Sequence, residues 1–269
     1  MAEVVNAVNS TAGGRKLLES VLGVHRDAPL PKYHSRSMRS RLKNQPTEGE
    51  GTPVEGTKGR VALFATCYGN RNVPEVGEDL VKVFEHNGIP VRLTEKEECC
   101  GMPKLEQGDL DTVEKYAKKN VPELVRLIDE GWDIVAPIPS CVLMFKQELP
   151  LMFPQDTGVQ KVRDAVFDPF EYLVLRHKEN RLNTEFKQPL GKIAYHVACH
   201  QRVQRIGPKT KEALELIPGI EIELIERCSG HDGTYAVKKE SHELSMKIAR
   251  PVVNRVKQDA PDHYSSDCA

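Results

Sequence analysis

The chain has 269 residues, which is enough for one large or two medium domains with substantial cores. Charged residues make up 29 % of the chain and its net charge is −1 at pH 7, so the composition does not indicate nucleic acid or another polyanion as a partner. No window approaches 18 uncharged apolar residues and the N-terminus lacks a signal-peptide pattern, so neither a transmembrane helix nor export is expected.

Residues 1–59 are predicted to precede the main fold as a helix, a basic arm and a linker. Residues 14–23 have the apolar spacing of a short amphipathic helix. Residues 31–43 are basic and nearly free of aliphatic side chains, which favours a solvated arm over a docking surface for an acidic partner. Residues 44–59 contain four glycines and two prolines, a composition typical of a linker.

Strands and helices are predicted to alternate from residue 60 onward. The three strands of this first half cover residues 60–67, 89–94 and 132–141. Helices are expected between them over 75–86 and 109–130, where Pro122 is predicted to split the longer one in two. This alternation predicts parallel βαβ units.

The second half has the same plan. Strands are predicted at 192–199 and 220–228, helices near 209–217 and 239–258, and residues 263–268 follow the last helix. A further helix at 169–178, opened by Asp168 as cap and Pro169 in its first turn, is expected to join the halves.

Each predicted strand end carries a cysteine, and the two halves match. The matching positions are separated by 132 residues for Cys67 and Cys199, 129 for Cys99 and Cys228, 129 for Gly101 and Gly230, and 127 for Cys141 and Cys268. This near-constant offset predicts an internal duplication of Rossmann-like βαβ domains with parallel sheets, the first at 60–165 and the second at 166–269.

The thiols of the first half are expected to converge, because carboxyl ends of parallel strands share one edge of a sheet. Seven cysteines, an odd number in a chain without an export signal, favour reduced thiols that bind metal or carry redox chemistry. Four thiolates suit zinc or a [4Fe–4S] cluster, and adjacent thiolates reach two irons of a cluster more readily than one zinc. Small core thiols or a redox dithiol are the alternatives. The four candidate ligands are Cys67, Cys99, Cys100 and Cys141.

These motifs resemble the CCG cysteine-rich domain. The resemblance rests on Cys67, Cys99-Cys100-Gly101 and Pro139-Ser140-Cys141, and in the second half on residues 195–200, 226–238 and 265–268. That domain occurs in duplicate in the B subunit of heterodisulfide reductase, in iron–sulfur subunits of lactate and glycolate oxidation, and in the C subunit of anaerobic glycerol-3-phosphate dehydrogenase. Residues 17–35, with the second-half motifs, look closest to the glycerol-3-phosphate dehydrogenase branch. The resemblance implies a [4Fe–4S] cluster, cubane or non-cubane, in the first domain.

Three departures from the family pattern concern the second site and the ends of the chain. Met144 stands where a closing Cys-x-x-Cys would have its second cysteine, and the second doublet is Cys228-Ser229. The chain stops one residue after Cys268 and has no ferredoxin-like Cys-x-x-Cys runs, so it is either a piece of a longer subunit or a short relative that uses a partner's clusters. The second site therefore holds iron–sulfur, zinc or nothing. Its candidate ligands are Cys199, Cys228, Cys268, His200 and His231. For the two histidines, and for His196, a hydrogen-bonding role at the edge of the site is favoured over metal binding.

The function that the resemblance implies is electron transfer by an iron–sulfur subunit without flavin. Such a subunit relays electrons from a flavoprotein dehydrogenase, of glycerol-3-phosphate or 2-hydroxy-acid type, towards quinone or another acceptor. A cluster-dependent disulfide or thiol reductase and a zinc-bound scaffold are the alternatives. Expected partners are the flavoprotein subunit and a ferredoxin-like protein, and the expected location is cytoplasmic, with membrane association only at the inner face and through a partner.

Overall fold

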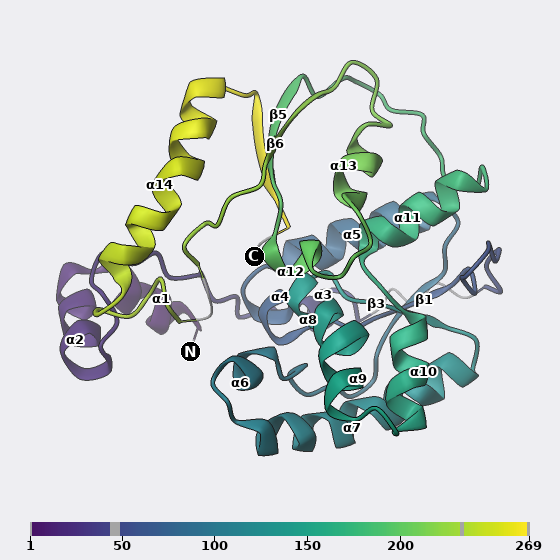
Figure 1. Ribbon diagram of the computed structural model, residues 1–269, viewed down its shortest axis with the longest axis horizontal. Helices are drawn as coiled ribbons and strands as arrows, with labels where there is room; N and C mark the ends of the chain where they lie inside the picture. The colour runs from purple at the N-terminus through teal and green to yellow at the C-terminus, as the bar shows by residue number, and fades with distance from the viewer. Residues whose placement is uncertain (1, 44–48, 232–233, 268–269) are drawn as a thin grey trace.

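The structure, a computed structural model, describes residues 2–43, 49–231 and 234–267 and contains two parallel β-sheets (Figure 1). The first sheet has the order β2-β1-β3-β4 and the second the order β6-β5-β7. Every strand pairs in parallel with its neighbours. The strands are β1 (Val61–Leu63), β2 (Val91–Leu93), β3 (Asp133–Val135), β4 (Val166–Phe167), β5 (Lys192–His196), β6 (Glu221–Ile225) and β7 (His263–Ser266).

The two sheets repeat one topology, which confirms the predicted α/β fold with duplicated parallel sheets. In each half the first strand is central, the second lies on one side and the third on the other. The short strand β4, which local patterns did not predict, extends the first sheet beyond β3. The domain limits at 60–165 and 166–269 stay predictions.

Helices cover both faces of the first sheet because the side chains of β1 alternate between them. Ala62 and Phe64 point to one core, and Val61, Leu63 and Ala65 point to the other. The first core is closed by α6 (Met102–Glu106), α7 (Leu110–Asp129), α8 (Pro139–Leu143), the π-helix η1 (Met144–Glu148), α9 (Leu149–Met152) and α10 (Thr157–Ala165). The second is closed by α3 (Met38–Arg41), α5 (Pro74–His86) and α11 (Pro169–Lys178).

Helix α7 is continuous, so the predicted split at Pro122 is wrong. The loss of one backbone donor at a proline weakens a helix but does not end it when both flanks are anchored. Here the apolar face buries Val113 and Val121 before the proline, and Leu124 and Leu127 after it. In contrast, α11 begins as predicted, since Asp168 caps it in a capping box with Pro169 in the first turn.

The second sheet is smaller. The long helix α14 (His242–Asp259) covers one of its faces, where Val252 packs with Ala194 and Ile225. The short helices α12 (Cys199–Arg202) and α13 (Lys209–Leu214) follow β5 and face the first half (Figure 1). There α13 packs against α11, and α12 packs against α8.

The N-terminal residues pack against both halves. Helices α1 (Ala2–Ser10) and α2 (Ala12–Leu22) form a hairpin beside the lower end of α14 (Figure 1). Val24 pairs with Lys238, and the His25 ring stacks on that of His242 with centroids 4.0 Å apart.

The basic arm is solvated only in part, because residues 37–42 dock on the first half, and this corrects the sequence-based interpretation. Met38 and Leu42 are buried in the core of the first half, and Arg39 and Arg41 pair with acidic side chains of this chain. The arm has few apolar residues, and this is why its sequence indicates a solvated segment. Two of them, Met38 and Leu42, lie on the face of α3 that packs against the first half. Among the described residues, no helix combines the length and apolar character that crossing a membrane requires.

Candidate metal centre

Four cysteines lie at the carboxyl edge of the first sheet, as the strand-end pattern predicted. Cys67 begins α4 (Cys67–Arg71), which follows β1. Cys99 and Cys100 lie between β2 and α6, and Cys141 lies in α8 after β3. The edge forms because three parallel strands in the order β2-β1-β3 end side by side.

The four thiols form one continuous group. Cys67 Sγ lies 3.9 Å from Cys99 Sγ, and the thiols of Cys99, Cys100 and Cys141 lie close enough to shift the pKa of their neighbours. Cys100 and Cys141 are buried, Cys99 is partly buried and Cys67 is exposed. The group therefore runs from the core to the surface, so one end is closed off from water and the other is open to it.

One thiolate is stabilised within this group. Hydrogen bonds from Cys100 and Cys67 lower the pKa of Cys99 to about 3. The same contact raises the pKa of Cys67, chiefly through its hydrogen bond to Cys99. The pKa of Cys100 is also raised well above its usual value, through its bonds to Cys141 and Cys99 and through burial. Binding of a metal to all four sulfurs would release the remaining thiol protons.

The doublet is held by the fold behind it. Asn120, on the buried face of α7, accepts a hydrogen bond from Glu98 N at 2.9 Å and donates one to Cys99 O at 3.1 Å. Gly101 has φ = 104°, a conformation that favours glycine, and caps α6. Thr66, directly before Cys67, has φ = 59° and accepts a hydrogen bond from Gly69 N. This backbone is strained for a β-branched residue, which is a common feature of functional sites.

Met144 occupies the position where the family pattern has a further cysteine. Its side chain is fully buried, and its Cε lies 3.5 Å from where a Cβ on Gly101 would be. Met144 also begins the π-helix η1, a form that recurs at functional sites. A thioether thus packs directly behind the doublet.

The donor set fits a thiolate-bound group in its chemistry. Soft sulfur ligands suit iron–sulfur clusters and zinc, and four of them lie together here. In residues 2–43, 49–231 and 234–267, however, no three His, Cys, Asp or Glu side chains are arranged so that they could hold a metal ion. The ligand assignment of Cys67, Cys99, Cys100 and Cys141 stays a prediction.

The second edge has a different character. Cys199 begins α12 after β5, Cys228 follows β6, and both are exposed. Cys228 Sγ accepts a hydrogen bond from Gly230 N at 3.3 Å. Cys268 lies outside the described residues, so the structure does not place the third predicted ligand of this edge.

The histidines of the second half take separate roles. His196 is buried and links all three strand ends, since its Nε2 donates to Arg227 O at 2.7 Å and its Nδ1 lies 3.1 Å from Ser266 Oγ. This agrees with the expected hydrogen-bonding role. His200 Nε2 lies 3.7 Å from Glu106 of α6, and His231 is exposed.

The two cysteine edges face each other. Helix α8, which carries Cys141, packs against α12, which begins at Cys199 (Figure 1). Gln204, buried after α12, donates hydrogen bonds to Pro139 O of α8 and to His200 O. The contact of His200 with Glu106 reaches α6, which begins directly after the doublet.

A buried polar network supports this junction from the side of the second half. Gln201 Nε2 donates to Thr210 Oγ1 at 2.9 Å and to Asp168 Oδ2 at 3.4 Å, and Thr210 donates to Asp267. Burial and the neighbouring Asp267 raise the pKa of Asp168 to about 7. Hydrogen bonds thereby connect Asp168, the cap of α11, and Asp267, which follows β7, to Gln201 in α12.

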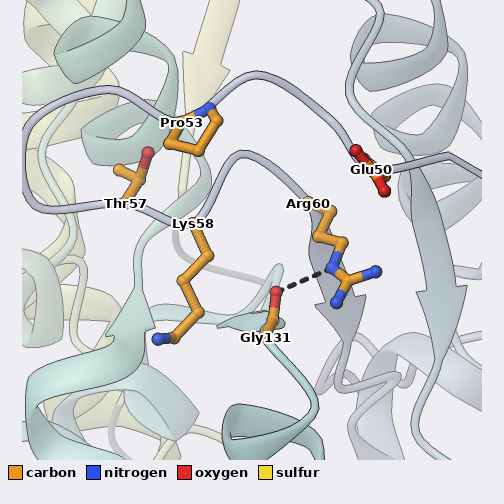
Figure 2. Close-up of a pocket in the computed structure, with 6 residues that line it drawn as sticks. All are labelled: Glu50, Pro53, Thr57, Lys58, Arg60 and Gly131. Carbon is orange, nitrogen blue, oxygen red and sulfur yellow. Dashed lines mark hydrogen bonds between the residues drawn. The ribbon is translucent and has the colours of Figure 1, made fainter.

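A hollow of about 500 Å³ lies at the opposite end of the first sheet (Figure 2). Arg60, directly before β1, donates to Gly131 O at 2.8 Å across its floor. Thr57 and Lys58 line another side. Because these residues precede the strands rather than follow them, the hollow is separate from the cysteine edge.

The sequence analysis did not predict the residues that hold the loop of the Cys99-Cys100 doublet in place. Asn120 had one recognisable signal, because it falls on the apolar face of an amphipathic helix with Val113, Ala117 and Leu124. A polar residue at such a position indicates a buried hydrogen-bonding task. Arg39 and Glu97, an ion pair beside the doublet, had no local signal since they lie 58 positions apart.

Comparison with known proteins matches both halves to one family. The sequence model of the CCG cysteine-rich domain matches residues 61–146 and 193–269. The C subunit of anaerobic glycerol-3-phosphate dehydrogenase from Escherichia coli K12 is 29 % identical over 269 residues, covering 99 % of this chain and 66 % of the relative. Lactate utilization protein A of Halalkalibacterium halodurans is 28 % identical, covering 78 % of this chain and 85 % of the relative. The protein of that name in Oceanobacillus iheyensis is 26 % identical, covering 76 % and 83 %. The chain thus spans just under two thirds of the length of the glycerol-3-phosphate dehydrogenase relative.

Proposed function

Since the chain belongs to the CCG cysteine-rich domain family, we propose that it is an iron–sulfur electron-transfer subunit of an oxidoreductase complex. The observation that carries the proposal is the contact of Cys67 with Cys99, continued through Cys100 to Cys141 at one sheet edge. The names of the relatives, a dehydrogenase subunit and a lactate utilization protein, support membership of such a complex.

The residues of the first edge have distinct tasks in this function. Cys67, Cys99, Cys100 and Cys141 would hold a [4Fe–4S] cluster, cubane or non-cubane, which supplies reversible one-electron transfer when bound. Asn120 and Gly101 hold the doublet, and the burial of Cys100 and Cys141 excludes water from one side. Exposed Cys67 leaves the other side within reach of a partner's redox centre. Burial and hydrogen bonding around the sulfurs tune the potential of such a site.

The partners proposed are a flavoprotein dehydrogenase, as electron donor, and a quinone or another acceptor. The dehydrogenase is of the glycerol-3-phosphate or 2-hydroxy-acid type, and a ferredoxin-like protein is a further partner. The protein works in the cytoplasm or at the inner face of the membrane, held there by a partner.

The test is reduction and reoxidation of the anaerobically purified protein. We expect iron and sulfide in the protein, an EPR signal that changes on addition of dithionite, and reoxidation by a soluble quinone analogue. Protein that contains iron but is neither reduced nor reoxidised would contradict the electron-transfer role.

A second candidate function is direct reduction of a disulfide substrate. It is favoured by the pairing of the low-pKa thiol Cys99 with the exposed Cys67, which leaves sulfur chemistry open to solvent. Reduced protein would then turn over a small disulfide, and Cys100→Ser would abolish turnover while iron is retained. A zinc-bound scaffold, the third alternative, would show stoichiometric zinc in native protein.

A further inference from the structure

The basic arm is docked on the first half through Met38, which is fully buried. A Cβ on Gly77 of α5 would lie 2.4 Å from Met38 Sδ, and one on Gly69 of α4 would lie 3.1 Å from its Cε. The two glycines therefore leave the space that Met38 fills, and this contact fixes α3 against the helix that Cys67 begins. The next residue along the arm is Arg39.

Arg39 contacts both elements that carry the first cysteines of the site. Its backbone N–H donates to Asn70 Oδ1 of α4 at 3.1 Å. Its guanidinium reaches the loop after β2, where Nη2 lies 3.0 Å from Glu97 Oε2 and 3.1 Å from Thr94 Oγ1. One residue of the arm thus joins the Cys67 helix to the Cys99 loop.

Glu97 completes the connection from the other side. Its Oε2 accepts a hydrogen bond from Ala65 N at 3.2 Å and another from Thr94 Oγ1. Its side chain is only 9 % exposed, so solvent and salt screen its interactions weakly. Ala65 and Glu97 each lie two residues before a cysteine of the close pair, Cys67 and Cys99.

Arg41 provides an internal comparison. It lies two residues further along the same short helix and also pairs with carboxylates, Glu75 and Glu78 of α5, at 2.9 Å each. These partners lie on α5 and not in the loops that carry Cys67 and Cys99. Loss of Arg41 should therefore weaken the arm's attachment without changing the charge beside the thiols.

We infer that the Arg39–Glu97 ion pair positions the Cys67 and Cys99 loops relative to each other and sets the local electrostatic potential of the first cysteine site. The electrochemical part of this inference rests on the proposed iron–sulfur function, while the positioning part does not. Arg39 and Glu97 act as positioning residues, since they touch the loops and not the sulfurs.

Because Arg39 and Glu97 carry opposite charges, their removal should shift the reduction potential of the site in opposite directions. Arg39→Gln removes a cation and leaves the carboxylate of Glu97 unpaired, which disfavours an added electron and lowers the reduction potential of the site. Glu97→Gln removes the anion, keeps an oxygen that accepts from Ala65 N, and raises the potential. A role limited to stability would change occupancy in both variants but would not shift the potential in opposite directions.

The positioning part is tested on the apoprotein by hydrogen exchange. In Arg39→Gln the Ala65 amide should exchange roughly fivefold faster, as expected for about 1 kcal/mol lost from its hydrogen bond. In Arg41→Gln the amides of α5 should exchange faster while Ala65 stays as in the wild type. Unchanged exchange at Ala65 in Arg39→Gln would overturn the positioning role.

The electrostatic part is tested by redox titration of the cluster-loaded protein, followed by EPR. The potential should fall in Arg39→Gln, rise in Glu97→Gln and stay constant in Arg41→Gln. Equal potentials in all four proteins would overturn it. A wild-type protein without iron would refute the proposed function instead, and the hydrogen-exchange experiment would still decide the positioning role.

Discussion

The side-chain amide of Asn120, at the centre of α7, donates a hydrogen bond to the carbonyl oxygen of Cys99 at 3.1 Å. The oxygen of the same amide accepts a hydrogen bond from Glu98 N at 2.9 Å. One buried side chain thus pairs with a backbone N–H and a backbone carbonyl of the loop that carries the doublet. A loop that would otherwise be free at the sheet edge is thereby fixed to the longest helix of the first half.

Replacement of Asn120 by alanine should release this loop. Two backbone groups would lose their partners in a partly buried place, so the free energy of unfolding should fall by about 2 kcal/mol. Iron content after reconstitution should fall as well. Chemical denaturation and iron analysis measure the two effects, with Lys115→Ala, an exposed position on the same helix, as the control. Wild-type stability and iron content in Asn120→Ala would contradict the role given to this residue.

The equivalent glycines of the two halves should respond differently to alanine. Gly101 has φ = 104° and Gly230 has φ = 73°, and alanine at such φ costs about 1–2 kcal/mol. A Cβ on Gly230 would also lie 2.3 Å from Ser245 O, whereas one on Gly101 meets only ordinary contacts. Gly230→Ala should therefore destabilise the fold more, and Gly101→Ala should reduce iron binding more.

Thermal unfolding and iron analysis of both variants test this ranking. Gly13→Ala, where a Cβ would meet nothing within 4 Å, is the control for a harmless substitution. The ranking is wrong if Gly101→Ala binds iron like the wild type, or if Gly230→Ala is the more stable of the two.

Stability should depend on pH through Asp133, which is 2 % exposed and opens β3. Its carboxylate accepts hydrogen bonds from Lys58 N at 2.6 Å and Tyr172 Oη at 3.0 Å, but burial dominates and raises its pKa to about 6. The folded state therefore holds this proton more tightly than the unfolded chain. Its contribution to stability is complete below about pH 4 and is lost as the pH rises through about 6.

Comparison with Asp133→Asn isolates this effect. The difference in unfolding free energy between the wild type and the variant should fall by about 3 kcal/mol from pH 4 to pH 7, at 1.36 kcal/mol per pKa unit. Tyr172→Phe removes a donor to the carboxylate and should move the midpoint to higher pH. A difference that stays constant over this range would refute the assignment.

The two cysteine edges should separate in a serine scan. Cys67→Ser, Cys100→Ser or Cys141→Ser should weaken iron binding at least about tenfold, because even residues that only support a ligand are worth about 10- to 100-fold. Cys199→Ser and Cys228→Ser alter the exposed thiols of the other edge and should leave most of the iron in place. Iron retention in Cys67→Ser and loss in Cys199→Ser would reverse the assignment of the two edges.

Local patterns predicted the elements that depend on local chemistry. The order of the strands, the cap at Asp168 and the repeat of one half by the other all follow from spacing along the chain, and the structure has them. The predicted strands 60–67 and 132–141 are too long, because β1 ends at Leu63 and β3 at Val135, and the cysteines that follow them lie in helices. The two-residue strand β4 and the continuity of α7 through Pro122 depend on tertiary packing, which outweighs weak local preferences.

The supporting residues of the site were beyond such patterns for a related reason. Arg39 reads as one more charge in a basic segment, and only the fold brings it to Glu97. The docking of Met38 likewise depends on two glycines in other helices. The cysteines could be predicted as a set because few other residues have their chemistry and they recur at matching positions. The residues that hold their loops in place are of common types, and only the fold shows which of them lie near the site.

Metal analysis of the native protein, purified without oxygen, tests the central claim most directly. An iron–sulfur site predicts iron and acid-labile sulfide in near-equal amounts, little zinc, and an EPR signal that depends on the oxidation state. Stoichiometric zinc without sulfide, or protein free of both metals after anaerobic reconstitution, would contradict it.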